Sequence, residues 1–197
     1  MTNILVTGSN GQLGSEIKAL SASYDYNFFL TDRMSLDITE KEEIKDYIDE
    51  HSIDIIINTA AYTAVDKAEE DKNNANKVNH LAVKYLAEIA KENNIKLIHV
   101  STDYVFDGKN YKPYNEDDVT NPNGVYGSTK LDGEKAMQKV NALNSIIIRT
   151  SWVYSSFGAN FVKTMLRLGK EREELGVIYD QVGTPTYAKD LAKAILD

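Results

Sequence analysis

Short, almost continuous runs of Ile, Val and Leu alternate along this chain with longer segments whose apolar residues recur at helical spacing. The apolar runs lie at residues 3–7, 28–31, 53–58, 96–101 and 145–150, and the helical patterns at 12–22, 39–50, 74–92 and 125–140. Strands that are apolar throughout are typical of parallel sheets covered by helices on both faces. Because crossovers between parallel strands are right-handed, the alternation predicts an α/β fold: a Rossmann-like doubly wound parallel sheet with helices on both faces.

The regular alternation ends near Trp152. Beyond it, the sequence predicts helices at 160–168 and 187–196 and a short strand at 177–179. A long connection at about 104–124 has no pattern of its own, and connections of that length often carry function.

Composition excludes several classes of protein. The 197 residues include 42% hydrophobic and 26% charged residues, with a formal net charge of −8 and no cysteine. Such an acidic chain is a poor non-specific binder of nucleic acid or of anionic membranes. Without cysteine there are no disulfides, no thiol catalysis and no thiolate metal sites. No stretch reaches the roughly 20 apolar residues of a membrane span, and there is no signal-peptide pattern, so we expect a cytoplasmic location.

A glycine-rich turn follows the first predicted strand and opens the first predicted helix. It reads Gly8-Ser-Asn-Gly11-Gln-Leu-Gly14. Glycines let a backbone turn tightly against a diphosphate, and a helix N-terminus offers free N–H groups and partial positive charge. The spacing is GxxGxxG, not the GxGxxG of the usual dinucleotide fingerprint. An ordinary glycine turn is the alternative, but the strand–turn–helix context favours a nucleotide site.

The second predicted strand ends at Asp32 and Arg33. A carboxylate at this place can accept hydrogen bonds from an adenosine ribose, which favours NAD, whereas an arginine can bind the 2′-phosphate of NADP. A solvated charged turn is the alternative interpretation. The pair therefore leaves NAD and NADP both open.

Two further segments carry groups suited to proton transfer. Tyr126 and Lys130 are four residues apart on a predicted helix, which places phenol and ammonium on one face. A nearby cation favours the phenolate and so helps a tyrosine to transfer protons. Thr102 ends the fourth predicted strand, at the sheet edge where such folds bind ligands. Each segment alone is compatible with a surface pair or a polar turn.

Taken in this order, the segments resemble the extended short-chain dehydrogenase/reductase superfamily and, within it, the dTDP-4-dehydrorhamnose reductase family. The glycine pattern and the set Thr102, Tyr126 and Lys130 match the superfamily's glycine motif and catalytic triad. Residues 58–69 (NTAAYTAVDKAE), 101–108 (STDYVFDG) and 149–154 (RTSWVY) carry the closer likeness, with 160–167 and 180–185 in support. The resemblance covers nearly the whole chain.

The resemblance implies an NADPH- or NADH-dependent oxidoreductase of dTDP-rhamnose and polysaccharide biosynthesis. Its substrate would be a dTDP-linked nucleotide sugar, dTDP-6-deoxy-L-lyxo-4-hexulose, whose 4-keto group is reduced to give dTDP-L-rhamnose. By this analogy Tyr126 donates a proton to the developing alkoxide. Lys130 would bind the nicotinamide ribose and lower the tyrosine pKa, and Thr102 would hydrogen-bond the reacting oxygen.

The residue patterns and the resemblance together give the candidate site residues. The cofactor-binding candidates are Gly8, Gly11, Gln12, Leu13, Gly14, Asp32, Arg33, Asp37, Ile38, Ala61, Tyr62, Thr63, Val100, Tyr126 and Lys130. The substrate-binding candidates are Thr102, Asp103 and Trp152. For Trp152 the alternative is a core aromatic, and His99 is interpreted as a satisfied sheet residue.

A metal site is not predicted. Glu16 matches a position that holds Mg²⁺ between subunits in some dimeric relatives, but a glutamate in a first helical turn is more often a partner of the helix dipole. A homodimer is compatible with the sequence, and no nucleic-acid or membrane partner is expected.

Members of the family continue well past the length of this chain. We therefore expect residues 1–151 to form an NAD(P)-binding Rossmann domain and 152–197 an incomplete substrate-binding lobe with the final sheet and helix elements. Two other functions stay open. One is a different nucleotide-sugar 4-ketoreductase or 4-epimerase, and the other is a non-catalytic NADP-binding regulatory subunit that resembles the methionine adenosyltransferase beta subunit.

Overall fold

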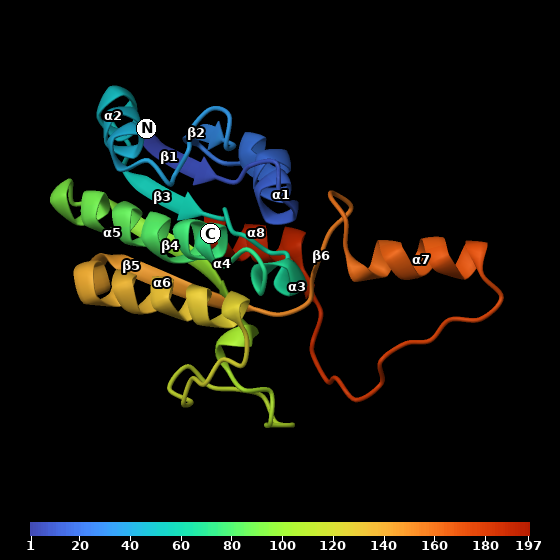
Figure 1. The fold of residues 1–197 in the computed structure, drawn as a ribbon. Helices are drawn as coiled ribbons and strands as arrows, with labels where there is room; N and C mark the ends of the chain where they lie inside the picture. Colours follow the sequence, from blue (N-terminus) through green and yellow to red (C-terminus); the bar gives the residue numbers. More distant parts are fainter.

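A computed structural model describes residues 1–197 and shows a five-stranded sheet in the order β2-β1-β3-β4-β5 (Figure 1). The strands are β1 (Thr2–Thr7), β2 (Tyr26–Thr31), β3 (Ile55–Asn58), β4 (Lys96–Thr102) and β5 (Ser145–Thr150). All four neighbouring pairs are parallel. The order runs outward from β1 in both directions, which confirms the predicted Rossmann-like doubly wound sheet.

Helices cover both faces of this sheet. On one face lie α2 (Lys41–His51), α5 (Ala82–Glu92) and α6 (Val125–Asn141), and on the other α1 (Gln12–Leu20) and α8 (Ala188–Leu196). Successive side chains of a strand point to opposite faces. Accordingly, Leu5 packs in one core with Leu86 and Met137, whereas Val6 packs in the other with Ile17 and Leu196.

The helix expected at 74–92 is interrupted. The structure has α3 (Val65–Ala68), α4 (Lys72–Asn76), a π-helical turn at Lys77–Leu81 and then α5. Apolar spacing alone cannot reveal such a turn, because the core positions on either side of it still look helical. π-Helical turns inside α-helices are frequent at functional sites.

The segment between Trp152 and α8 lies outside the five-stranded sheet. Strand β6 (Val153–Tyr154) pairs with β7 (Thr186–Tyr187), and α7 (Phe161–Glu171) has no buried residue and projects from the sheet (Figure 1). The strand predicted at 177–179 is wrong, because this apolar triplet is exposed and no strand lies beside it. No helix of the protein combines the length and apolarity that crossing a bilayer requires.

Candidate active site

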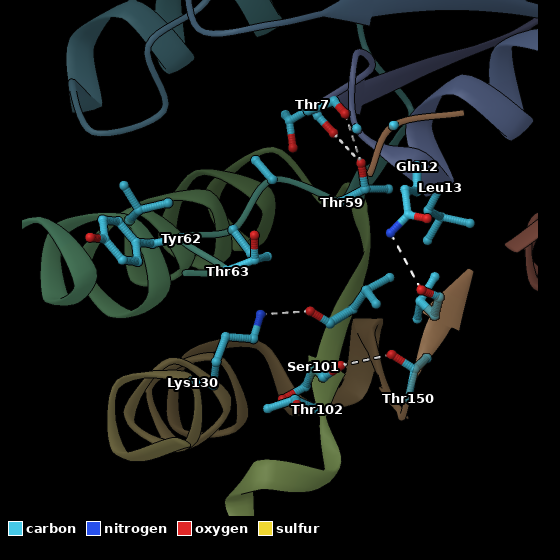
Figure 2. A pocket seen from close by; sticks show the side chains of 18 of the residues that line it. Thr7, Gln12, Leu13, Thr59, Tyr62, Thr63, Ser101, Thr102, Lys130 and Thr150 are labelled. Carbon is cyan, nitrogen blue, oxygen red and sulfur yellow. Dashed lines mark hydrogen bonds between the residues drawn. The ribbon is translucent and has the colours of Figure 1, made fainter. Parts of the chain in front are cut away.

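A cleft of about 790 Å³ lies along the carboxyl ends of the sheet strands (Figure 2). Each of β1 to β5 contributes lining residues at or just after its end, including Thr7, Asp32, Thr59, Thr102 and Thr150. The cleft brings together every predicted site residue except Gly14, namely Gly8, Gly11, Gln12, Leu13, Asp32, Arg33, Asp37, Ile38, Ala61, Tyr62, Thr63, Val100, Thr102, Asp103, Tyr126, Lys130 and Trp152.

The first turn of α1 opens into this cleft. Gly11 is the N-cap and makes no side-chain cap, so the first N–H groups of the helix have no partner from a capping side chain. Gln12 and Leu13 lie beside the cleft in Figure 2. An uncapped helix start with its partial positive charge suits a diphosphate group, so these residues fit a dinucleotide cofactor.

Gly14 has a different role from the one predicted. A Cβ at this position would lie 2.5 Å from the Gly8 carbonyl oxygen and 2.6 Å from Ser9 Cα. Gly14 therefore lets α1 pack closely against the glycine-rich turn, and it does not line the cleft.

Asp32 and Arg33 lie at the β2 end of the cleft. Asp32 Oδ1 accepts from the backbone N–H of Met34 at 3.0 Å, and its Oδ2 accepts from Asn10 Nδ2 at 2.6 Å. Hydrogen bonds from Ser35, and then those from Met34 and Asn10, hold the pKa of Asp32 below its usual value. Arg33 Nε lies 3.5 Å from Asp37 Oδ2 and its side chain is 85% exposed. The carboxylate that would favour NAD and the guanidinium that would favour NADP therefore both lie at this end of the cleft.

The loop after β3 is held by a residue that the sequence analysis missed. Asn79, from the π-helical turn, accepts from Tyr62 N at 2.8 Å and donates to Tyr62 O at 3.1 Å. Its Nδ2 also lies 3.2 Å from Thr129 Oγ1 on α6. Asn79 is buried, so it joins the cleft loop to the helix that carries Tyr126 and Lys130. The sequence does contain a signal for Asn79, since it is a polar residue within an apolar stripe of the predicted helix.

Lys130 extends from α6 toward β4 and is almost wholly buried (Figure 2). Its Nζ donates to Val100 O at 2.7 Å and lies 3.2 Å from His99 Nε2. Burial lowers the pKa of Lys130 to about 8, and the charge of Glu134 opposes that shift.

Tyr126 has a pKa above its usual value. Burial is the main cause, the charge of Asp103 adds to it, and the Thr102 hydroxyl opposes it. The lowering by Lys130 that the resemblance implied is not found, since the Lys130 amine is directed to Val100 and His99. A phenol whose pKa lies above the usual value of about 10 keeps its proton at neutral pH.

Thr102 and Asp103 form one polar group at the end of β4. Thr102 Oγ1 donates to Asp103 Oδ1 at 3.1 Å and accepts from Tyr104 N at 3.2 Å. Burial raises the pKa of Asp103. The carboxyl group thus lies in the cleft beside the hydroxyl and the phenol.

Trp152 lines the cleft and the residue is 40% exposed, so it is not a core aromatic. Its backbone has φ 49°, in the left-handed region, which costs about 1–3 kcal/mol in a residue other than glycine. The hydrogen bond from Thr186 N to Trp152 O, at 3.3 Å, helps to hold that conformation through β7.

Two more residues position α6 against the turn that carries Thr102. A Cβ at Gly127 would lie 2.2 Å from Tyr104 O, so glycine allows the helix to touch this turn. Glu69 Oε1 accepts from Val125 N at 2.7 Å and thereby satisfies an N–H at the helix start. Neither role was predicted, because both depend on contacts between segments far apart in the sequence.

Arg149 and Glu16 both have partners in the fold. Arg149 Nη2 lies 2.7 Å from Glu134 Oε2. Glu16 is 3% exposed and its Oε1 accepts from Ser155 Oγ at 2.6 Å.

Comparison with known proteins identifies the family. The RmlD substrate binding domain family matches residues 1–197. The dTDP-4-dehydrorhamnose reductase of Aggregatibacter actinomycetemcomitans is 46% identical over 197 residues, which is 100% of this chain and 67% of the relative.

Solved structures agree with that match. The crystal structure of a dTDP-4-dehydrorhamnose reductase from Clostridium acetobutylicum has a TM-score of 0.95 and 44% identity, covering 99% of this chain and 69% of that one. The Bacillus anthracis enzyme, solved in complex with NADP, has a TM-score of 0.94 and 39% identity, covering 99% and 70%. The chain thus spans about two thirds of the length of these relatives. It belongs to the RmlD substrate binding domain family, the family of the dTDP-4-dehydrorhamnose reductases.

Proposed function

We propose that this chain carries the cofactor site and catalytic residues of an NADPH- or NADH-dependent reductase. The reaction is the reduction of the 4-keto group of dTDP-6-deoxy-L-lyxo-4-hexulose to dTDP-L-rhamnose. The observation that carries this proposal is the cleft itself, in which Thr102, Tyr126 and Lys130 lie across from the uncapped start of α1. The named relatives and the NADP complex of one of them support it.

The cofactor would extend along the strand ends. Gly11, Gln12 and Leu13 would hold its diphosphate, while Asp37 and Ile38 would lie beside the adenine. Lys130 would bind the nicotinamide ribose. When bound, the reduced nicotinamide supplies the hydride that reduction of a ketone requires.

Side chains of the protein would supply the proton that the ketone oxygen takes up. Tyr126 has a raised pKa, so its phenol keeps a proton until negative charge develops on the ketone oxygen and then donates it. The Thr102 hydroxyl can turn from Asp103 to that oxygen and stabilise the charge. For the Lys130 ammonium to stabilise the phenolate that remains on Tyr126, its Nζ must turn from Val100 and His99 toward that oxygen.

The sugar is proposed to contact Asp103 and Trp152. We further propose the division into a cofactor-binding domain at 1–151 and a substrate lobe at 152–197, with α8 of the latter packed on the sheet beside α1. A cytoplasmic location and a homodimer stay predictions of the sequence.

The proposal is tested by binding and turnover in parallel. NADPH and NADH are titrated against the chain by fluorescence, alone and with dTDP-L-rhamnose present, and ketosugar reduction is followed by loss of the reduced cofactor. We expect the sugar nucleotide to tighten cofactor binding. Cofactor binding that ignores the sugar nucleotide, without any turnover, would favour the regulatory-subunit alternative.

A further inference from the structure

A row of buried polar side chains leads from β1 to Lys130. Thr7 Oγ1 donates to Asn58 Oδ1 at 2.6 Å, Asn58 Nδ2 lies 3.0 Å from His99 Nδ1, and His99 Nε2 lies 3.2 Å from Lys130 Nζ. Each of the four side chains is 0–1% exposed. Water therefore has little access to these side chains, and their donors and acceptors must be matched chiefly by groups of the protein.

The orientation of Asn58 is fixed by its neighbours. Its Oδ1 accepts from the backbone N–H of Ala60 at 3.2 Å as well as from Thr7. A backbone N–H can only donate, so the oxygen must face Ala60 and the Nδ2 amide must face His99. His99 Nδ1 then accepts, and the single proton of the neutral imidazole lies on Nε2.

This arrangement places the ring N–H of His99 against Lys130 Nζ. An ammonium has three donors and no lone pair, so it cannot accept that hydrogen bond, whereas a neutral amine can. The neutral amine would still donate to Val100 O and keep one N–H directed into the cleft.

We propose that Asn58 holds His99 as the Nε2–H tautomer and that this N–H donates a hydrogen bond to the nitrogen of Lys130. His99 is thereby a positioning residue that favours the neutral amine of Lys130 over its ammonium. The sequence had suggested only a satisfied sheet residue.

Other groups around Lys130 also affect the equilibrium between its ammonium and its neutral amine. Glu134, on the next turn of α6, favours the ammonium, but its carboxylate is bound by Arg149 of β5. Tyr126 on α6 and Asp103 after β4 are the titratable groups on the cleft side. The π-helical turn and α5 face α6 with the uncharged Asn79 and Val83.

The tautomer of His99 does not depend on the proposed function, but its consequence for catalysis does. If the ammonium must stabilise the Tyr126 phenolate, the reduction slows as pH rises through the Lys130 pKa, which burial lowers to about 8. By favouring the neutral amine, His99 would then lower the pH above which the reduction slows.

Nuclear magnetic resonance of the cofactor-free chain tests the inference directly. Histidine is labelled with nitrogen-15 and lysine with carbon-13, and the His99→Phe variant assigns the His99 signals among the three histidines. We expect a neutral ring with its proton on Nε2 at about pH 9, above the Lys130 pKa of about 8, because burial holds the pKa of His99 well below its usual value. A ring that carries its proton on Nδ1, or on both nitrogens, would overturn the proposal.

The Asn58→Asp variant should reverse the direction of the hydrogen bonds on both sides of His99. Its carboxylate still accepts from Thr7 and Ala60 but now also accepts from His99 Nδ1–H, which frees Nε2 to accept from the Lys130 ammonium. We expect the proton to move to Nδ1 and the Lys130 pKa to rise by about one unit or more. The Asn58→Asp/His99→Phe double variant keeps the new charge without the ring.

An equal rise of the Lys130 pKa in the single and double variants would refute a role for His99. Should the variants fail to fold, the wild-type tautomer still decides the question. A correct tautomer in a chain that binds neither NADPH nor NADH would count against the proposed function and not against this inference.

Discussion

The two walls of the cleft are built differently. The wall with Thr102, Tyr126 and Lys130 rises from buried strand ends and from α6, which packs into the main core through Met137. The opposite segment, from Val153 to Tyr187, contains the strand pair β6–β7 and the projecting α7, which buries no residue.

A few polar contacts connect that segment to α1. Asn160 Nδ2 donates to Gln12 Oε1 at 2.9 Å, Gln12 Nε2 donates to Val153 O at 3.4 Å, and Ser155 Oγ donates to Glu16. The cofactor and proton-transfer side is therefore built into the core, while the proposed sugar side depends on isolated hydrogen bonds. Substitutions in the two regions should then differ in which property they change.

The largest effect is expected from Tyr126→Phe. Removing the phenol hydroxyl should lower turnover by about 10²–10⁴-fold, because the proton donor is lost. Nucleotide affinity should stay within about twofold, since the ring remains packed against Tyr104. Rate assays and fluorescence titration measure the two quantities. A variant that loses both equally would mean that the hydroxyl supports the fold of the wall instead.

Next comes the pH dependence conferred by Lys130. Its folded pKa of about 8 lies below the usual 10.5, so the unfolded chain binds more protons between these values and stability rises with pH across this window. Relative to Lys130→Met, the wild type should gain about 3 kcal/mol of unfolding free energy from pH 7 to above pH 10.5. Urea denaturation at several pH values gives the difference, and a pH-independent difference contradicts the burial effect.

A matched pair of glycine substitutions compares the regions themselves. Gly127→Ala places a methyl group against Tyr104 O and should destabilise the protein by about 1–3 kcal/mol. Gly169→Ala on α7, where a Cβ meets nothing within 4 Å, should be neutral or stabilise that helix by up to about 1 kcal/mol. Equal losses in the two variants would show that α7 is more tightly packed than its exposure indicates.

The effect of Ser155→Ala should be confined to the contact between α1 and the segment after β6. Glu16 loses a hydrogen bond to its buried carboxylate, at a cost of about 1–3 kcal/mol locally. We expect faster proteolysis within 156–185 and weaker binding of dTDP-L-rhamnose, with NADPH affinity little changed. Ser156→Ala is the neighbouring control. Loss of NADPH affinity to the same degree would mean that the segment and the glycine-rich turn act as one unit.

The accuracy of sequence-based prediction follows the same division. The five sheet strands were recognisable because each contains a short run of apolar residues, and the ligand edge followed from the fold class. The triplet at 177–179 has strand-forming residues too, yet a strand needs a hydrogen-bonding partner and none lies beside it. Asn79, Glu69 and the link between His99 and Lys130 could not be predicted, because each depends on segments that meet only in the folded chain.

The π-helical turn at Lys77–Leu81 changes the phase of the helix that contains it. One extra residue in a turn rotates all preceding side chains by about 100° relative to an unbroken α-helix. Asn79 can thus face Tyr62 and Thr129 while Val83 and Leu86, further along, stay in the sheet core. Deleting one residue from this turn would leave Val83 and Leu86 in the sheet core but rotate the Asn79 amide away from the loop, together with the buried Ala75 of α4, so the cleft would lose its shape.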